Sequence, residues 1–403
     1  MPTPEAAAVR HNVRLIDTGS EADLHAALVA LDPAARDLAM RRGVMSAVLL
    51  EDLAIDQARV VARVAARGGA TAVPDPEGRR CLLLGPRNAV AGIPAGLRAF
   101  SDQPRIVELA NTLEAGILAA VRPPAPLRLG AHTWTFGHRT YVLGILNVTP
   151  DSFSGDGVGD DLALVQARAE ALVAAGADAL DVGGESTRPG HEPIPVAEEL
   201  RRVVPAVRAL APSLGVPISV DTAKAAVARA ALEAGAVCIN DIWGLRRDPE
   251  MAAVAAEADA AVICMHNQAA TAYQDLVGDV LRDLRRSLAA AAAAGLAAER
   301  CVVDPGFGFG KDPAQNLELL RRLRDLRVLG RPVLVGTSRK STIGRILDGR
   351  PVTERLHGTA ATVAWAIAAG ADIVRVHDVA AMRDVSRVTD AIVRGRPPDP
   401  APG

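Results

Sequence analysis

The most constraining feature of this sequence is an eightfold alternation of two patterns between residues 131 and 393. Short runs rich in valine and isoleucine, typical of β-strands, are each followed by a longer stretch of alanine and leucine with helical spacing. The strand-like runs are YVLGILNV, ALDVGG, PISVDT, VCINDI, AVICMH, CVVDPG, PVLVGTS and IVRVHDV. Eight alternating units in about 250 residues are typical of a (β/α)8 barrel. We therefore predict an α/β fold with a (β/α)8 TIM barrel at residues 131–393.

The residues before the barrel predict a second, smaller domain. The 403 residues exceed what one ordinary domain needs, and residues 1–122 alternate strand-like and amphipathic helical stretches. We expect an additional N-terminal α/β or α+β domain there, of unknown function, with a structural or oligomerisation role as the simplest reading. Proline-rich residues 123–130 are predicted to be a linker, and residues 394–403 a tail. The stretch LRLGAHTWTFGHRT (127–140) predicts a small hairpin that closes the far end of the barrel.

Composition excludes several classes of function. The formal net charge of -2 offers no general attraction to nucleic acid or to an anionic membrane. The sequence has no uninterrupted apolar run of about 18 residues, so no membrane span is expected, and its first residues lack the apolar core of a signal peptide. The 4 cysteines show no CxxC spacing. A reducing cytoplasm is therefore the expected compartment.

Each predicted barrel strand ends in a polar or polarisable residue. The active site of such a barrel lies at the carboxyl ends of its strands. Any one of these residues alone is adequately explained as a turn-former or helix cap, but their coincidence at eight strand ends predicts a catalytic mouth. The residues are Asn147, Asp181, Asp221, Asn240, Asp241, Met265, His266, Asp304, Ser338, Arg339, Lys340, Arg375 and His377.

Five motifs at these strand ends are more specific than the barrel pattern. LNVTPDSFSGDG, DVGGESTRPG, VDPGFGFGK, GTSRKS and RVHDV occur in this order at strands one, two, six, seven and eight. Together they resemble the dihydropteroate synthases of folate biosynthesis, over about 131–393. The resemblance implies a transferase that condenses 6-hydroxymethyl-7,8-dihydropterin diphosphate with 4-aminobenzoate and releases pyrophosphate and 7,8-dihydropteroate.

The resemblance assigns five of these residues to a pterin pocket. Buried carboxylates and amides suit the donors on the edge of a pterin ring, because an unpaired ring donor is costly to desolvate. Lys340 can donate to the ring carbonyl or a ring nitrogen, and Met265 offers a polarisable surface for the flat ring. Core packing is the alternative for Met265, and a turn is the alternative for Asp304. The five residues are Asp221, Asn240, Met265, Asp304 and Lys340.

The diphosphate requires positive charge. Arg375 and His377 are two residues apart on a strand, so both side chains can face the same side, and the resemblance implies that they hold the diphosphate. It also implies that Asn147 binds Mg2+, which prefers oxygen ligands and substrate phosphates. A buried structural histidine and a strand-ending turn are the alternatives for His377 and Asn147.

The aminobenzoate site is expected in the loops after the strands. Ser341 begins a predicted helix, STIGRIL, whose free N–H groups can face a carboxylate, and Phe309 in GFGFG can stack on the ring. The Gly- and Pro-rich loops after strands one and two can close over the substrates. The loop positions that the resemblance implies are Phe153, Thr187, Arg188 and Pro189.

The expected mechanism follows from charge. Mg2+, Arg375 and His377 stabilise the leaving pyrophosphate, Asp221 faces the cation left on the pterin methylene, and the neutral amine attacks. With Lys340, these residues are the predicted catalytic set, and a homodimer is expected. Two other functions stay open at this point: a methyltransferase that uses methyltetrahydrofolate and a corrinoid partner, and a non-catalytic pterin-binding protein.

Overall fold

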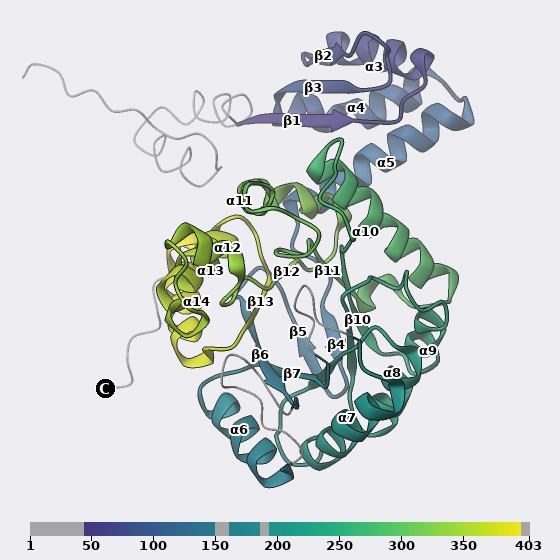
Figure 1. Cartoon of the computed structure of the whole chain (residues 1–403). Helices are drawn as coiled ribbons and strands as arrows, with labels where there is room; N and C mark the ends of the chain where they lie inside the picture. The colour runs from purple at the N-terminus through teal and green to yellow at the C-terminus, as the bar shows by residue number, and fades with distance from the viewer. Residues whose placement is uncertain (1–43, 150–160, 186–192, 396–403) are drawn as a thin grey trace, which may run out of the picture. The chain divides into compact units, whose positions relative to one another are not determined.

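The computed structural model describes residues 44–149, 161–185 and 193–395 (Figure 1). Within these ranges, no helix combines the length and the apolar character that crossing a membrane requires.

The chain divides into two compact units, Met1–Ile117 and Leu118–Gly403. The boundary falls inside helix α5 (Pro104–Val121). Strand β4 begins at Leu127, so the segment predicted to be a linker contains the start of the hairpin. Helix α14 continues to Arg394, the first residue of the predicted tail.

The first unit is an antiparallel sheet covered by helices. Strands β1 (Met45–Leu50), β3 (Cys81–Pro86) and β2 (Thr71–Pro74) lie in the order β1-β3-β2. Helices α3 (Ile55–Gly68), α4 (Arg87–Phe100) and α5 contribute to one apolar core with this sheet, which includes Val61, Leu83, Ile93, Leu97 and Ile106. This confirms the expected additional α/β or α+β domain, and the antiparallel sheet makes it the α+β kind. The part of this domain predicted before residue 44 lies outside the described residues.

The second unit is a nearly closed barrel of eight parallel strands. Its strands are β6 (Tyr141–Asn147), β7 (Ala179–Gly183), β8 (Ile218–Asp221), β9 (Cys238–Asp241), β10 (Ala261–Met265), β11 (Cys301–Asp304), β12 (Leu334–Val335) and β13 (Ile373–Val376). They lie in the order β11-β10-β9-β8-β7-β6-β13-β12. An isolated parallel bridge between Val303 and Val333 joins the two ends of this order. The predicted (β/α)8 fold is therefore confirmed.

Helices surround the barrel on the outside (Figure 1). They are α6 (Leu162–Ala174), α7 (Val196–Leu210), α8 (Ala225–Glu233), α9 (Met251–Glu257), α10 (Leu276–Ala293), α11 (Pro313–Arg321), α12 (Ser341–Ile346), α13 (Leu356–Ala368) and α14 (Val379–Arg394), with short 3-10 turns at Ala298–Arg300, Leu323–Leu329 and Val352–Glu354. Local caps define several helix starts. The Asp312 carboxylate, for example, accepts from the backbone of Gln315 at 2.8 Å, and Pro313 occupies the first turn, where its missing N–H costs nothing.

A hairpin closes the amino-terminal end of the barrel. Strands β4 (Leu127–Leu129) and β5 (His132–Trp134) pair in antiparallel register. The Trp134 ring stacks on Tyr141 at the start of β6, with centroids 4.3 Å apart. The hairpin's apolar residues share a core with the first residues of the barrel strands. The inside of the barrel at this end is therefore filled by apolar side chains.

Candidate active site

A buried ion-pair cluster lies at the carboxyl end of the barrel. Arg375 on β13 donates through Nε to Asp181 at 2.6 Å and through Nη2 to Asp221 at 2.7 Å. Asn240 on β9 donates to the same Asp181 oxygen at 2.8 Å. Four strands therefore bring their polar side chains to one point, as the strand-end pattern predicts.

Burial changes the acidity of Asp221. The side chain is almost fully buried, and its Oδ1 has no hydrogen-bond partner within the described structure. Burial raises the pKa of Asp221 to about 7, with Asp181 adding to the effect and the cation of Arg375 opposing it. One arginine thus pairs with two carboxylates. Asp221 is close to half ionised at neutral pH.

The loop after β11 forms the second half of the site. Asp304 ends the strand, and its Oδ1 accepts from the Gly306 N–H at 2.7 Å. Lys340 donates to the carbonyl oxygen of Phe307, and its Nζ lies 4.2 Å from the centre of the Phe309 ring. Burial lowers the pKa of Lys340 to about 8, while the charge of Asp304 opposes the shift. The lysine, the aromatic ring and the carboxylate predicted here therefore lie together.

The glycines of GFGFG explain how this loop fits. Gly306 has a φ of 72°, and a Cβ on it would lie 1.9 Å from the carbonyl oxygen of His266. Gly310 has a φ of 56°, and its Cβ would lie 2.3 Å from the carbonyl oxygen of Gln268. Only glycine allows both the left-handed backbone and the close approach to the segment after β10.

The remaining predicted residues border the same end of the barrel. The Asn147 Oδ1 atom lies 3.8 Å from the Cβ position built on Gly183, as does Asp221 Oδ2. The Nδ1 atom of His377 is 3.0 Å from the Ser338 hydroxyl, which also accepts from the backbone N–H of His377. Met265 is buried at the end of β10, and Ser341 is exposed as the first residue of α12.

Four predicted residues lie outside the described ranges: Phe153, Thr187, Arg188 and Pro189. The residues on both sides of the loop that carries Thr187, Arg188 and Pro189 lie within the described ranges. Lys224 binds Glu185 on one side of this loop at 2.6 Å and the carbonyl oxygen of Ile194 on the other at 2.7 Å.

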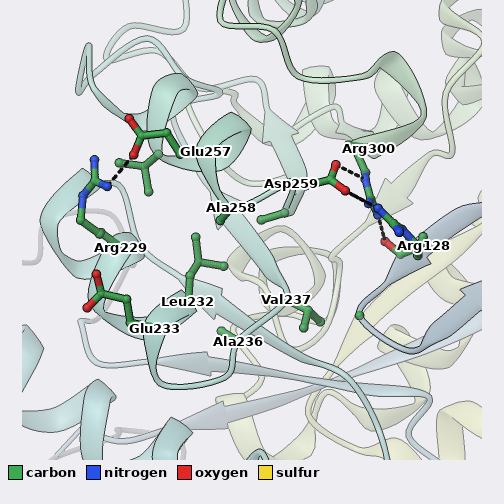
Figure 2. Close-up of a pocket in the computed structure, with 13 residues that line it drawn as sticks. Arg128, Arg229, Leu232, Glu233, Ala236, Val237, Glu257, Ala258, Asp259 and Arg300 are labelled. Carbon is green, nitrogen blue, oxygen red and sulfur yellow. Dashed lines mark hydrogen bonds and ion pairs between the residues drawn. The ribbon is translucent and has the colours of Figure 1, made fainter.

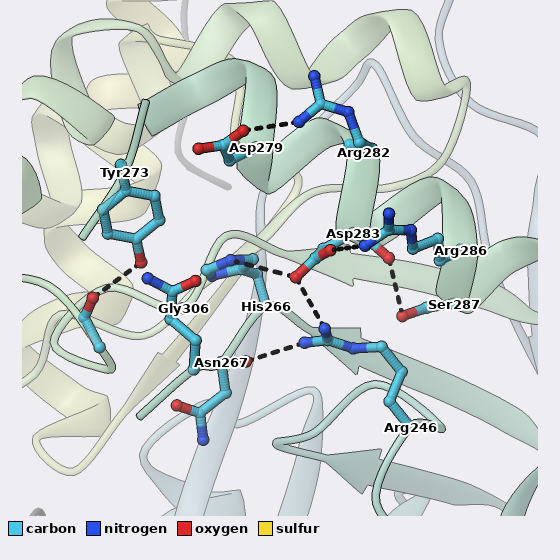
Figure 3. A network of polar contacts seen from close by, with 12 residues as sticks. Arg246, His266, Asn267, Tyr273, Asp279, Arg282, Asp283, Arg286, Ser287 and Gly306 are labelled. Carbon is cyan, nitrogen blue, oxygen red and sulfur yellow. Dashed lines mark hydrogen bonds and ion pairs between the residues drawn. The ribbon is translucent and has the colours of Figure 1, made fainter. Parts of the chain in front are cut away.

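Two parts of the site lie outside the roles predicted from the sequence. Asp181 was recognised only as a strand-end residue, although a carboxylate within the apolar run ALDVG is itself a signal of buried pairing. The second part is a network around His266, whose ring faces Asp283, with Nε2 3.7 Å from Oδ2. Asp283 also binds Arg246 at 2.7 Å (Figure 3). Burial lowers the pKa of His266 to about 3, so this ring is neutral at physiological pH.

A separate hollow lies toward the opposite end of the barrel strands (Figure 2). Its arginines are already paired with carboxylates: Arg229 binds Glu257 at 2.6 Å, and Arg128 and Arg300 share Asp259. No polar residue of the predicted set lines it. We assign the chemistry to the carboxyl end.

Comparison with known proteins agrees with this geometry. A family model described as pterin binding enzyme matches residues 143–377. A dihydropteroate synthase from Synechocystis is 48% identical over 278 residues, which are 67% of this chain and 96% of that protein.

Solved structures give the same result. A Xanthomonas albilineans dihydropteroate synthase with 4-aminobenzoic acid is 44% identical, with a TM-score of 0.63, and the match covers 67% of this chain and 98% of that one. A Burkholderia cenocepacia dihydropteroate synthase complexed with 7,8-dihydropteroate is 46% identical, with a TM-score of 0.62, and the match covers 68% and 98%.

The chain therefore belongs to the pterin binding enzyme family, among its dihydropteroate synthases. Its activity is that of a transferase of folate biosynthesis. The two other functions that the sequence left open, a corrinoid-dependent methyltransferase and a non-catalytic pterin-binding protein, find no support among these relatives.

Proposed function

We propose that the carboxyl end of this barrel joins 6-hydroxymethyl-7,8-dihydropterin diphosphate to 4-aminobenzoate with the residue roles given below. The observation that carries the proposal is the cluster of Arg375, Asp181 and Asp221, with Lys340 and Asp304 beside it. The charges of Asp304, Arg375 and Asp221 all act on the pKa of Lys340, so these groups are electrostatically coupled.

The pterin ring is bound by the deepest groups. Asp221 and Asp304 accept hydrogen bonds from the ring's amino and N–H donors, and Asn240 supplies an amide. Lys340 donates to the ring carbonyl or a ring nitrogen, and Met265 packs against the ring face. A buried carboxylate with an unpartnered oxygen, as in Asp221, is suited to this task because the ligand provides the missing donor.

The diphosphate is bound by Arg375 and His377. Arg375 keeps its charge under all conditions, and its contacts with two carboxylates fix its orientation before substrate arrives.

The side chains present also fit a magnesium ion. The described residues contain no cluster of three acidic, histidine or cysteine ligands, which favours an ion held mainly by phosphate and water. The amide oxygen of Asn147 is the hard, neutral ligand that such an ion accepts. Bound there, Mg2+ would neutralise charge on the leaving diphosphate.

The aminobenzoate lies nearer the solvent. Phe309 stacks on its ring, the N–H groups at Ser341 face its carboxylate, and the loop residues Phe153, Thr187, Arg188 and Pro189 complete the site.

The reaction breaks the carbon–oxygen bond to the diphosphate and forms a carbon–nitrogen bond. Arg375 and His377 stabilise the negative charge that develops on the leaving group. The ionised Asp221 stabilises the positive charge that develops on the pterin methylene. The amine attacks in its neutral form and loses a proton afterwards, so no enzyme nucleophile is required.

One experiment tests this proposal. Purified protein with Mg2+ is mixed with the pterin diphosphate, and pyrophosphate is measured with and without 4-aminobenzoate. We expect release only with the amine. Release that does not depend on the amine, or no release, contradicts the proposed function.

We further propose a cytoplasmic homodimer. All four cysteines are buried free thiols, as expected in a reducing compartment. Val388 and Ile392 lie one turn apart on α14 and are 61% and 75% exposed, which offers an apolar contact for a second copy. Sedimentation at micromolar concentration tests the dimer, and a monomer there contradicts it.

A further inference from the structure

Of the 45 basic side chains in the sequence, only Lys224, Lys311 and Lys340 are lysines. All three follow barrel strands at the carboxyl end, after β8, β11 and β12. Arginine occupies every other basic position. Lys340 belongs to the proposed pterin pocket, whereas Lys311 has no assigned role.

Lys311 is buried, with 8% of the residue exposed. Its Nζ atom contacts three acceptors: the carbonyl oxygen of Gly306 at 3.1 Å, the carbonyl oxygen of Phe309 at 3.0 Å and Nδ1 of His266 at 2.9 Å. An ammonium group has three N–H donors, so each donor has a partner. The compact tetrahedral ammonium suits three acceptors around one point better than a planar guanidinium does.

The acceptor on His266 is compatible with this arrangement. A neutral imidazole whose Nδ1 accepts carries its proton on Nε2, and Nε2 faces the Asp283 carboxylate (Figure 3). His266 therefore ties Lys311 to the segment that follows β10, while its Nε2 makes no hydrogen bond within the described residues. Tyr273, whose ring centre is 5.9 Å from Nζ, donates to the carbonyl oxygen of Gly310 at 2.8 Å.

The rest of the loop 305–310 is held in the same way. The Gly306 N–H donates to Asp304, and the Gly308 N–H donates to the buried Asn316 at 2.6 Å. Lys340 also holds this loop, because it donates to the carbonyl oxygen of Phe307. Removal of Lys311 would take the buried donor from the Phe309 carbonyl and leave the Gly306 carbonyl with the Phe309 N–H alone, on either side of the carbonyl that Lys340 binds.

We propose that Lys311 is a positioning residue of the pterin pocket: it holds the loop 305–310 in the shape that places the Phe307 carbonyl and the Phe309 ring around Lys340. This inference rests on the proposed function, because Lys340 is assigned there to the pterin. Lys311 itself acts through the loop and touches no reacting atom.

The test uses the full chain with 13C-labelled lysine side chains. Three lysines give three ε-carbon signals, and the Lys340 signal reports the loop without any ligand. We expect Lys311→Met to shift the Lys340 signal and its titration midpoint. We also expect it to raise the Kd of the pterin diphosphate about tenfold or more, because buried carbonyls lose their donor, and to change kcat less. The exposed Arg321→Met on α11 is the control and should change neither quantity by more than about twofold.

Lys311→Arg keeps a positive charge but not the ammonium geometry, and it serves if the methionine variant does not fold. We expect the same shift of the Lys340 signal and weaker pterin binding. A Lys340 signal and a pterin Kd that both stay within the control range in a folded variant overturn the inference. Failure of the wild-type protein to bind the pterin contradicts the proposed function instead, and the ligand-free Lys340 signal then decides the positioning role of Lys311.

Discussion

Arg375 and Asp221 form an ion pair inside the barrel, with Nη2 2.7 Å from Oδ2. The same guanidinium also binds Asp181 at 2.6 Å, so one cation faces two buried carboxylates. Burial outweighs the attraction of Arg375 and raises the pKa of Asp221 to about 7. The site therefore gains or loses a proton within the physiological range, and its ability to accept hydrogen bonds from a pterin changes with it.

This predicts how pH affects the reaction. As pH rises toward about 7, Asp221 ionises, and kcat/KM for the pterin diphosphate should rise with it; at higher pH kcat/KM should fall again, because Lys311 and Lys340 lose their protons at about 7 and 8. Asp221→Asn should abolish this rise and lower kcat/KM by about a hundredfold, as expected for a group that acts in the transition state. The exposed Asp384→Asn should leave the profile unchanged. A rise near pH 7 that persists in Asp221→Asn would assign the ionisation to another group.

The three lysines should titrate in a defined order. Burial lowers the pKa of Lys311 to about 7 and that of Lys340 to about 8. Burial also acts on Lys224, but its hydrogen bonds to Glu185 and Glu199 outweigh that effect and raise its pKa. Titration of the labelled lysine signals should therefore show Lys311 losing its proton first, Lys340 next and Lys224 last. The reverse order for Lys224 and Lys311 contradicts the contacts described above.

Local sequence patterns predicted the barrel well because each strand and helix carries its own periodicity. Helix α4 shows where this fails. Its sequence RNAVAGIPAGLRAF contains Pro94 and two glycines, which locally favour a turn. Val90, Ile93 and Leu97 are nonetheless almost fully buried on one face, so tertiary packing overrides the local signal.

The candidate site was predictable where a residue ends a strand, as at Asp304, or lies in a specific motif, as at Lys340. Pairings between distant residues were not predictable. Arg375 is 194 residues from its partner Asp181, and Lys311 is 45 residues from His266. Neither separation leaves a periodic signal in the sequence, because the closure of the barrel alone brings these residues together.

Two glycine substitutions should separate backbone strain from close contact. Gly306 and Gly295 have φ values of 72° and 86°, but a Cβ on Gly295 meets no atom within 4 Å. Gly295→Ala should cost about 1–2 kcal/mol of unfolding free energy from the left-handed backbone alone. Gly306→Ala should cost more and should also lower pterin affinity, because its Cβ collides with the His266 carbonyl. Denaturant unfolding measures the free energies and calorimetry measures the pterin affinities. Equal losses of both quantities in the two variants would contradict this distinction.

Asn147 should determine how pterin diphosphate binding depends on magnesium. Its amide oxygen is the protein ligand that we propose for the ion, so Asn147→Ala should raise the Mg2+ concentration needed for half-maximal binding by about tenfold. Calorimetry of binding at several Mg2+ concentrations measures this directly. Binding at saturating Mg2+ should approach that of the wild type. An unchanged Mg2+ dependence would exclude Asn147 as a ligand.

The barrel should fold and react without the first unit. Removal of residues 1–117 leaves the hairpin of β4 and β5, which closes the barrel, and all described site residues intact. We expect this truncated chain to unfold cooperatively and to retain amine-dependent pyrophosphate release within about threefold, because the hydrophobic clusters of the two units contain different residues. Removal through Thr135 is the matched control: it also deletes Trp134 and its stacking on Tyr141, and it should expose the apolar end of the barrel and prevent stable folding. A folded but inactive chain beginning at Leu118 would show that the first unit contributes to the reaction. A chain without the hairpin that is equally stable would show that the barrel needs no closure at its amino-terminal end.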